Sequence, residues 1–178
     1  MTNSELGKRE RLVAGACRVL HEQGVEATTL ADIAEAADVP VGNVYYYFKT
    51  KDELIEAAID AHADHIQTVL AEFERHRTPR ARLKALALSW TEVAEQVARY
   101  GCQHGTLCQE LAKRDDGLDR RAAKLMALAV DWAEEQFRLM GKRDARDLGV
   151  GLVAAVQGTA LLTSSLRAPE IMTRQAHR

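Results

Sequence analysis

Residues 28–51 constrain the fold of this chain more strongly than any other segment. Apolar side chains recur at helical spacing between positions 30 and 37, and Asp32 stands three residues after Thr29, the spacing of a capping box. Asp38 tolerates left-handed backbone better than most residues, and Pro40 fits the first turn of a helix. The segment therefore predicts two short helices, near residues 30–37 and 41–48, joined by a tight turn.

The rest of the chain also favours helix. Of its 178 residues only 3 are proline and 5% are aromatic, whereas 47% are hydrophobic and 28% are charged, a composition typical of a soluble helical protein. We expect an all-α fold, with an N-terminal three-helix domain over residues 1–50 and a helical domain over residues 51–178. The residues after Pro169 fit either a further helix or a frayed tail. The other expected helices span residues 4–23, 51–75, 79–100, 106–114, 118–140 and 144–166.

Charge does not identify a partner for residues 1–51. The chain has a net charge of -2, and this segment holds six basic and seven acidic side chains, whereas nucleic-acid-binding domains are usually basic. Binding must therefore depend on where individual side chains stand. Lys51 is a cation in the first turn of an expected helix, where anions are favoured, and a docked phosphate would account for it. In isolation, Lys49 and Lys51 would be interpreted as solvated surface lysines; their position directly after the aromatic-rich helix favours the phosphate-binding interpretation.

The second short helix has the chemistry of a helix that enters the DNA major groove. Gly42 has no side chain and lets the backbone approach closely, and Asn43 can donate and accept hydrogen bonds at base edges or phosphate. The tyrosines at positions 45–47 span most of a helical turn, so they cannot all enter a small core. At least one hydroxyl must point outward, where a phosphate is a suitable acceptor.

Residues 10–55 resemble the DNA-binding domain of the TetR family of one-component transcriptional regulators. The resemblance lies in Thr28-Thr29-Leu30, Ile33-Ala34, Ala37-Asp38-Val39, Gly42-Asn43-Val44-Tyr45-Tyr46-Tyr47-Phe48 and Lys49-Thr50-Lys51-Asp52-Glu53-Leu54. It implies that the DNA backbone is held by Thr29, Gly42, Tyr45, Tyr47 and Lys51. It implies base-facing positions at Val41, Asn43 and Tyr46, and Thr28 and Lys49 complete the expected set of DNA contacts.

The chain departs from the family pattern at two places. Asp38 replaces the usual glycine of the turn, and Pro40-Val41 replaces the more usual polar pair that enters the second helix. Both departures are compatible with the fold. Because of them, the operator sequence cannot be predicted from the family pattern.

Beyond residue 55 the resemblance is one of architecture. It implies a small-molecule effector pocket among the middle helices and a homodimer built from the last two long helices. Apolar and small residues along 118–140 alternate in steps of four and three, which independently suggests a seam for a partner helix. Packing within one chain is the alternative interpretation. The seam residues are Leu118, Ala122, Leu125, Ala129, Trp132, Gln136 and Met140.

The sequence specifies the effector pocket poorly. Cys102 and His104 lie in a glycine-flanked break between helices, where a thiol near a helix N-terminus can become reactive. The run resembles a Gly-Cys-x-x-Gly-x-Leu segment of several TetR-type regulators, some of which sense reactive molecules. A thiol-based redox or electrophile sensor or enzyme using Cys102 is therefore the alternative function, and a buried structural cysteine is the simpler interpretation. The expected ligand-binding residues are Trp90, Tyr100, Cys102, His104, Leu107, Met126 and Phe137, whose apolar members also suit an ordinary core.

Other classes of site have little support. Cys17, Cys102 and Cys108 form an odd set without paired spacing, which fits a reducing cytoplasm. His62 and His65 share a helix face but lack further ligands at fixed spacing, so we expect two solvated side chains and no metal site. We also expect no enzyme activity and no cofactor, because no phosphate-binding loop, nucleophile elbow or paired carboxylates stand on a recognisable frame.

Residues 148–166 carry no charged side chain and are just long enough to cross a membrane. Their glycine, threonine and serine content favours a helix buried on nearly every side, with no membrane contact. Together these patterns predict a cytoplasmic, homodimeric, ligand-responsive transcriptional regulator. Its simplest form is a repressor that a small molecule releases from a palindromic double-stranded operator. The effector, the operator and the choice between repressor and activator stay open.

Overall fold

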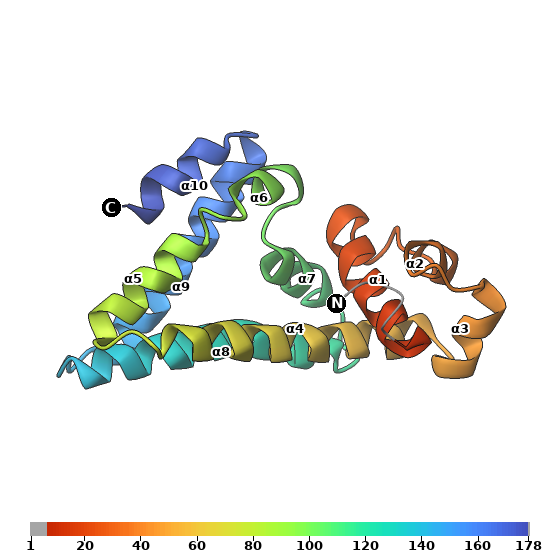
Figure 1. Cartoon of the computed structure of the whole chain (residues 1–178), viewed down its shortest axis with the longest axis horizontal. Coiled ribbons are helices and arrows are strands. Elements are labelled where there is room, and N and C mark those ends of the chain that lie inside the picture. The colour runs from red at the N-terminus through yellow and green to blue at the C-terminus, as the bar shows by residue number, and fades with distance from the viewer. Residues whose placement is uncertain (1–6, 178) are drawn as a thin grey trace.

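The computed structural model describes residues 7–177, which form α-helices joined by short turns and contain no strand. The predicted start of the first helix at residue 4 lies outside the described residues. The helices are α1 (Lys8–Gln23), α2 (Leu30–Ala36), α3 (Val41–Tyr47), α4 (Lys51–Phe73), α5 (Pro79–Ser89), α6 (Ala94–Tyr100), α7 (Gln103–Leu111), α8 (Leu118–Leu139), α9 (Ala145–Ser165) and α10 (Pro169–Ala176). Figure 1 shows α1–α3 at one end of the long helices α4 and α8, with α5, α6, α9 and α10 towards the other.

The first three helices pack closely because α1 presents a glycine to α2. A Cβ at Gly15 would lie 3.1 Å from the carbonyl oxygen of Ile33 and 3.2 Å from the Cβ of Ala37, so a side chain here would force the helices apart. Val44 and Phe48, which are 0% and 3% exposed, anchor α3 to the same core. The outer face of α3 is therefore directed to solvent.

Local hydrogen bonds define the two short helices and their turn. Thr29 and Asp32 form the predicted capping box at the start of α2, with Asp32 N donating to Thr29 Oγ1 at 3.2 Å and Thr29 N donating to Asp32 Oδ2 at 2.8 Å. Asp38 has a φ of 52°, which confirms the left-handed turn. Pro40 is the N-cap residue of α3 rather than part of its first turn, and the helix begins at Val41.

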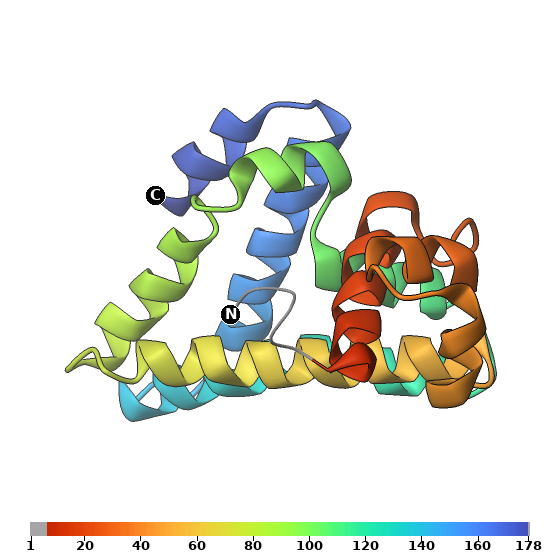
Figure 2. The ribbon, with the colours of Figure 1, turned by 45° about the vertical axis from the view of Figure 1, so that its right-hand side comes forward.

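One hydrophobic core continues from the first three helices into α4, α7 and α8. Leu12 of α1, Leu54 of α4, Leu111 of α7 and Leu125 of α8 are each 0% exposed and belong to a single cluster. Figure 2 shows α1–α3 resting on one end of α4. The division at residue 50 stays a prediction, and packing is continuous across it.

The middle of the chain differs from the predicted single helix over residues 79–100. It forms α5 and α6 with a turn between them. The hydroxyls of Ser89 and Thr91 donate to the carbonyl oxygens three residues earlier, at 2.8 Å and 2.7 Å. Such bonds compete with the backbone ladder of a helix and favour its end. The turn places Trp90 at a corner between the two helices.

The next helix, α7, begins at Gln103 rather than near residue 106. Gly101, with a φ of 83°, ends α6. Cys102 then serves as the N-cap residue, and its Sγ accepts a hydrogen bond from Gly105 N at 3.3 Å. A sulfur acceptor is a less usual cap than a hydroxyl or carboxylate, so residue type did not indicate this helix start.

Most of the seam predicted along residues 118–140 faces into its own chain, whereas Met140 at its end is 37% exposed. Leu118, Ala122, Leu125 and Gln136 are 4%, 0%, 0% and 1% exposed. They are buried because α8 packs against α4, α5, α7 and α9 of the same chain. The assignment of this seam to a partner helix was therefore wrong, and packing within one chain accounts for it.

An exposed apolar stripe lies on α9 instead. Val150, Leu161 and Leu166 are 47%, 57% and 64% exposed, and Gly151 and Gly158 have no atom within 4 Å of an added Cβ. Among residues 7–177, α9 is the one helix long and apolar enough to span a membrane, with a mean hydropathy of 1.4, and 22% of that window is buried. The prediction that this helix is buried on nearly every side is wrong for the described chain.

The chain continues after α9 as a further helix, α10, rather than a frayed tail. Pro169 is its first residue, where the missing N–H has no cost. Met172 is 2% exposed and packs with Val97 of α6 and Ala160 of α9. This small second core closes the end of the molecule away from α1–α3.

Candidate nucleic-acid interface and internal cavity

The helix α3 turns one face to the core and the other to solvent. Val44 is 0% exposed, whereas Val41, Tyr45 and Tyr46 are 50%, 53% and 79% exposed. Nothing lies within 4 Å of a Cβ added to Gly42, so the backbone at the start of the helix is open. A short, exposed helix with an open backbone at its start suits insertion into a groove.

The remaining predicted residues of α3 flank this exposed face. Asn43 and Tyr47 are half-buried, and the ring of Tyr47 meets the ring of Tyr46 edge-on with centroids 5.0 Å apart. The structure thus brings together Val41, Gly42, Asn43, Tyr45, Tyr46 and Tyr47 on one helix.

The two threonines before α2 have roles within the chain. Thr28 is 2% exposed and its Oγ1 donates to Gly24 O at 2.6 Å. Its side chain is therefore not available to DNA, and the predicted contact was wrong. Thr29 is exposed, and its hydroxyl donates to Asp32 Oδ2 at 2.7 Å. Contact of Thr29 with the DNA backbone stays a prediction.

The two lysines after α3 contact backbone carbonyl groups. Lys49 Nζ donates to Tyr45 O at 2.5 Å, near the end of α3, where a cation is favoured. Lys51 Nζ donates to Glu26 O at 3.3 Å and so links the start of α4 to the loop before α2. An ammonium group has three donors, so each lysine can still bind a phosphate.

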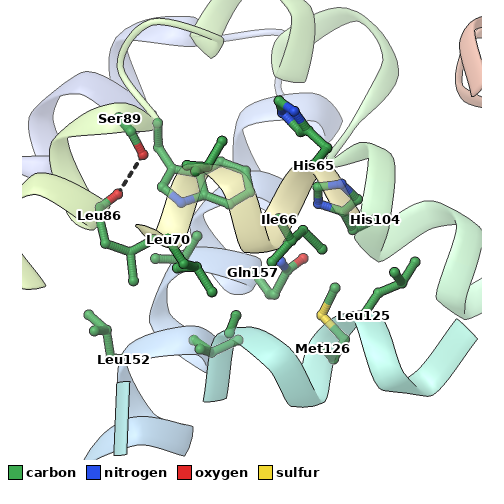
Figure 3. Close-up of a pocket in the computed structure, with 15 residues that line it drawn as sticks. His65, Ile66, Leu70, Leu86, Ser89, His104, Leu125, Met126, Leu152 and Gln157 are labelled. Atoms are coloured by element: carbon green, nitrogen blue, oxygen red, sulfur yellow. Dashed lines mark hydrogen bonds between the residues drawn. The ribbon is translucent and has the colours of Figure 1, made fainter. Parts of the chain in front are cut away.

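A cavity of about 130 Å³, here called the inner cavity, lies among α4, α5, α7, α8 and α9 (Figure 3). Its polar lining residues are His65, Ser89, His104 and Gln157, and none of its lining residues is Asp, Glu, Lys or Arg. The apolar lining residues are Ile66, Val69, Leu70, Leu86, Trp90, Leu125, Met126, Ala129, Leu152, Val153 and Val156.

A second cavity of about 410 Å³, here called the outer cavity, lies beside the first. The two share the wall formed by His65, Val69, Ser89, Trp90 and His104. The outer cavity is the more polar, because its lining adds carboxylate, amide and thiol groups. A largely apolar cavity with a few polar groups is typical of a small-molecule site. The added polar residues include Glu72, Glu92, Gln96, Cys102 and Gln103.

Comparison with known proteins identifies the architecture. The family model described as "Bacterial regulatory proteins, tetR family" matches residues 12–58. An uncharacterised HTH-type transcriptional regulator of Mycobacterium tuberculosis is 32% identical over 173 residues, which cover 94% of this chain and 84% of that protein. This chain belongs to the TetR family. The HTH-type transcriptional regulator TtgR of Pseudomonas putida is 29% identical over 161 residues, covering 84% of this chain and 77% of TtgR.

Solved structures agree on the fold of this TetR-family protein. A TetR transcriptional regulator from Legionella pneumophila has a TM-score of 0.86 and 19% identity, and the match covers 97% of this chain and 95% of that one. The chain is a DNA-binding transcriptional regulator, with α2 and α3 as its helix-turn-helix.

Four of the seven predicted ligand-binding residues line the cavities of the regulator. Trp90 and His104 line both, Met126 lines the inner cavity and Cys102 lines the outer one. The prediction missed several polar residues that line the inner cavity. Of these, His65 was interpreted as a solvated side chain, and Ser89 and Gln157 carry no sequence signal of a binding role.

The other three predicted residues lie away from both cavities. Tyr100 borders a surface hollow, with its ring edge-on to His21 at a centroid distance of 5.6 Å. Leu107 is 4% exposed within the core shared with α1 and α4. Phe137, near the end of α8, lines neither cavity. Aromatic or apolar type alone does not distinguish a cavity wall from an ordinary core.

Burial keeps two histidines of the regulator neutral. The rings of His62 and His104 meet edge-on with centroids 5.0 Å apart. Burial, with a smaller contribution from nearby histidines, lowers the pKa of His104 to about 3 and that of His62 to about 4. His62 is 6% exposed, so the prediction of a solvated side chain is wrong for it, whereas His65 is exposed. Within residues 7–177, no group of three or more His, Cys, Asp or Glu side chains is placed to hold a metal.

The three cysteines are free thiols in different surroundings. Cys102 is 5% exposed, and its Sγ accepts hydrogen bonds from Gly105 N at 3.3 Å and from Gln157 Nε2 at 3.5 Å. Burial raises the pKa of Cys17 and of Cys108 to about 11, so both remain protonated at neutral pH. Only the Cys102 thiol lines a cavity among those described here.

Polar contacts tie the α7 region of the regulator to its DNA-binding helices. At the start of α7, His21 Nε2 of α1 lies 2.9 Å from the carbonyl oxygen of residue 101. Near its end, Glu110 Oε2 accepts a hydrogen bond from Val25 N at 2.5 Å. Just beyond it, the Arg114 guanidinium donates to the Asp52 carboxylate at 3.0 Å and 2.7 Å. α7 thus contacts both the cavity wall and the helix-turn-helix end.

Proposed function

We propose that this regulator is a cytoplasmic homodimer that represses transcription by binding a palindromic operator, and that a small molecule bound in its cavities releases it. The observation that carries the proposal is that α7 joins a largely apolar cavity to the helices that present α3. Membership of the TetR family supplies the DNA-binding function. The cavity can hold an effector, and the contacts of α7 connect the cavity to the DNA-binding helices.

On the DNA side, α3 enters the major groove. Asn43 and Tyr46 face the base edges with Val41 beside them, and Tyr45 and Lys51 hold the phosphate backbone. The exposure of Tyr45 and Tyr46 and the open backbone at the start of α3 support this arrangement. The further backbone contacts are Thr29, Gly42, Tyr47 and Lys49.

An effector acts on DNA affinity through α7. His104 and Cys102 at its start line the cavities, so a ligand that displaces them moves the helix. Glu110 and Arg114 then carry the displacement to the loop before α2 and to the first turn of α4. Because binding is linked, the operator and the effector weaken each other's affinity by the same factor.

The dimer is built on the exposed stripe of α9, with α8 beside it. Leu161 and Leu166 are more than half exposed, and Gly151 and Gly158 let a partner helix approach closely. An apolar stripe of this length is unusual on a monomer surface. A twofold axis places the two α3 helices one DNA turn apart, ~34–36 Å, which requires a palindromic operator.

Fluorescence anisotropy with a labelled duplex from the DNA upstream of the chain's own coding sequence tests the DNA contacts. We expect Tyr45→Ala and Lys51→Ala each to weaken binding about tenfold or more, and affinity to fall steeply with salt because phosphate contacts release counterions. Lys142→Ala is the matched control, since Lys142 is an exposed lysine beyond the end of α8. Unchanged affinity in both variants, with helicity intact by circular dichroism, would remove the contact assignment.

A thiol-based response of Cys102 is the second candidate function. The observation that favours it is the position of Sγ at the N-terminus of α7, where it receives two N–H groups and borders the outer cavity. Labelling with iodoacetamide across pH compares it with the internal controls Cys17 and Cys108. We expect iodoacetamide to label Cys102 faster than these two. Equal labelling of all three thiols rejects this candidate.

A further inference from the structure

The size of the inner cavity limits its ligand to about one ring. Its volume of about 130 Å³ is close to the ~150 Å³ of an engineered apolar cavity that binds benzene. Trp90 and Met126 in its wall offer an aromatic face and a polarisable sulfur, both of which pack well against a flat ring.

The charges around the cavities exclude anions. No Lys or Arg lines the inner cavity to neutralise one, and burial holds the His104 ring neutral. The outer cavity adds the carboxylates of Glu72 and Glu92. An anion entering past them would lose its hydration without gaining a counterion, which is costly in an apolar site.

The wall of the inner cavity presents two hydrogen-bond acceptors. Gln157 Nε2 donates to Cys102 Sγ at 3.5 Å, and Gln157 Oε1 has no hydrogen-bond partner among residues 7–177. The Ser89 hydroxyl donates its proton to Leu86 O at 2.8 Å, which leaves its oxygen as an acceptor (Figure 3). A ligand that donates a hydrogen bond is therefore favoured over an ether or a ketone.

His104 supplies a hydrogen-bond donor. Gln103 Nε2 lies 3.2 Å from His104 Nε2. An amide nitrogen only donates, so Nε2 of the neutral ring is the acceptor and Nδ1 carries the proton. No partner for this N–H exists within the described part of the chain. Figure 3 shows His104 and Gln157 on neighbouring parts of the cavity wall.

We propose that the inner cavity binds a neutral, apolar molecule of about one ring that carries a hydroxyl group. The hydroxyl donates to Gln157 Oε1 and accepts from the His104 N–H, and the ring packs against Trp90 and Met126. A hydroxyl fits because it is both donor and acceptor. The identification of this molecule as the effector rests on the proposed function, whereas its binding does not.

Tryptophan fluorescence tests the proposal directly. In a Trp132→Phe background, quenching of Trp90 reports binding of p-cresol, 4-methylcyclohexanol, toluene and benzoate. We expect p-cresol to bind about tenfold more tightly than toluene, because it forms the hydrogen bonds that toluene lacks. Benzoate is expected to bind at least a hundredfold more weakly than p-cresol. The two alcohols compare an aromatic with a saturated ring, and both should exceed toluene.

Gln157→Met removes the acceptor at nearly constant volume, and Gln67→Met, at an exposed position on α4, is its matched control. We expect Gln157→Met to bring p-cresol affinity closer to that of toluene, because only the hydrogen bond from His104 remains. Toluene affinity should be unchanged, which also shows that the cavity is intact. Equal binding of toluene and p-cresol, tight binding of benzoate, or unchanged affinity in Gln157→Met overturns the proposal. These assays contain no DNA, so loss of operator binding would contradict the proposed function and leave this result standing.

Discussion

The helix-turn-helix end and the cavity end of this regulator are held together in different ways. In α1–α3, the start of α2 and the turn after it are fixed by contacts between residues close in sequence, the Thr29–Asp32 cap and the left-handed backbone at Asp38. Around the inner cavity, the walls come from helices as distant as α4 and α9. The first region is built to present a fixed surface. The second has loosely filled space that a ligand can occupy, and α7 joins the two.

The largest expected difference between the two regions is in how their stability depends on pH. The pKa values of His104 and His62 are lowered, to about 3 and about 4, so between those values and about 6.5 the unfolded chain binds more protons than the folded chain. Stability therefore falls as pH decreases, by about 4 kcal/mol between pH 7 and pH 5. Urea unfolding at both pH values measures this loss.

Two histidine variants sharpen the acid test. His104→Leu should reduce the pH dependence, whereas His76→Leu, at an exposed position after α4, should leave it unchanged. At the other end of the molecule, the hydrogen bond from the Thr29 side chain lowers the pKa of Asp32, so the α2 cap remains ionised over the same pH range. A pH dependence equal in all three proteins would show that the buried imidazoles are not its cause.

The second largest expected effect is a loss of stability when the contact between α8 and α9 is disturbed. A Cβ at Gly149 would lie 2.9 Å from Glu134 N and 3.0 Å from Val130 O, so Gly149→Ala forces two backbones apart. We expect a loss of about 2 kcal/mol in the free energy of unfolding. Gly42→Ala on α3 has open space and should change stability by less than about 1 kcal/mol. Similar thermal shifts for the two variants would contradict this packing.

The contacts of α7 should contribute less to stability than the α8–α9 packing, and more to the coupling between ligand binding and DNA binding. Glu110→Ala leaves the Val25 N–H without its acceptor, with an expected cost of about 1.5 kcal/mol. The variant should also reduce the effect of a ligand on operator affinity, because one tie between the cavity and the DNA-binding helices is lost. Gln109→Ala, at the neighbouring exposed position, is the control. Unchanged ligand response in Glu110→Ala would assign the coupling to another contact.

The smallest expected effect is local to α2. Thr29→Ala removes the side-chain cap that accepts from Asp32 N and should cost about 1 kcal/mol. Thr29→Ser retains the hydroxyl and serves as the control. Thermal unfolding measures both variants. A loss in Thr29→Ser as large as in Thr29→Ala would show that the methyl group, rather than the cap, stabilises α2.

The difference between the two regions also decides what the sequence could predict. The cap of α2 and the turn before α3 depend on neighbours within a few residues. Their residue types were therefore sufficient to predict them from the sequence. Thr28 was misassigned because a threonine just before a cap can face either way, and here its hydroxyl bonds a carbonyl four residues earlier. No local signal distinguishes these two orientations.

The cavity walls depend on how distant helices meet. Trp90 and Met126 line the inner cavity, whereas Leu107, of similar character, fills the core. Gln157 was missed because its contact with Cys102, at the start of α7, joins positions 55 residues apart in the sequence. The turn that ends α5 was detectable in principle, since Ser89 and Thr91 flank Trp90 with two hydroxyls that can bond backbone carbonyls.

The continuous core from α1 to α8 has a consequence for the evolution of such chains. Leu12 and Val44 are completely buried partly because α4 and α7 cover the first three helices. A fusion that transplanted residues 7–50 alone onto a foreign sensor would uncover this apolar surface. An exchange of sensor domains must therefore retain α4 and α7 with the DNA-reading helices, or replace them with helices of matching shape. The transferable module is larger than the motif that contacts DNA.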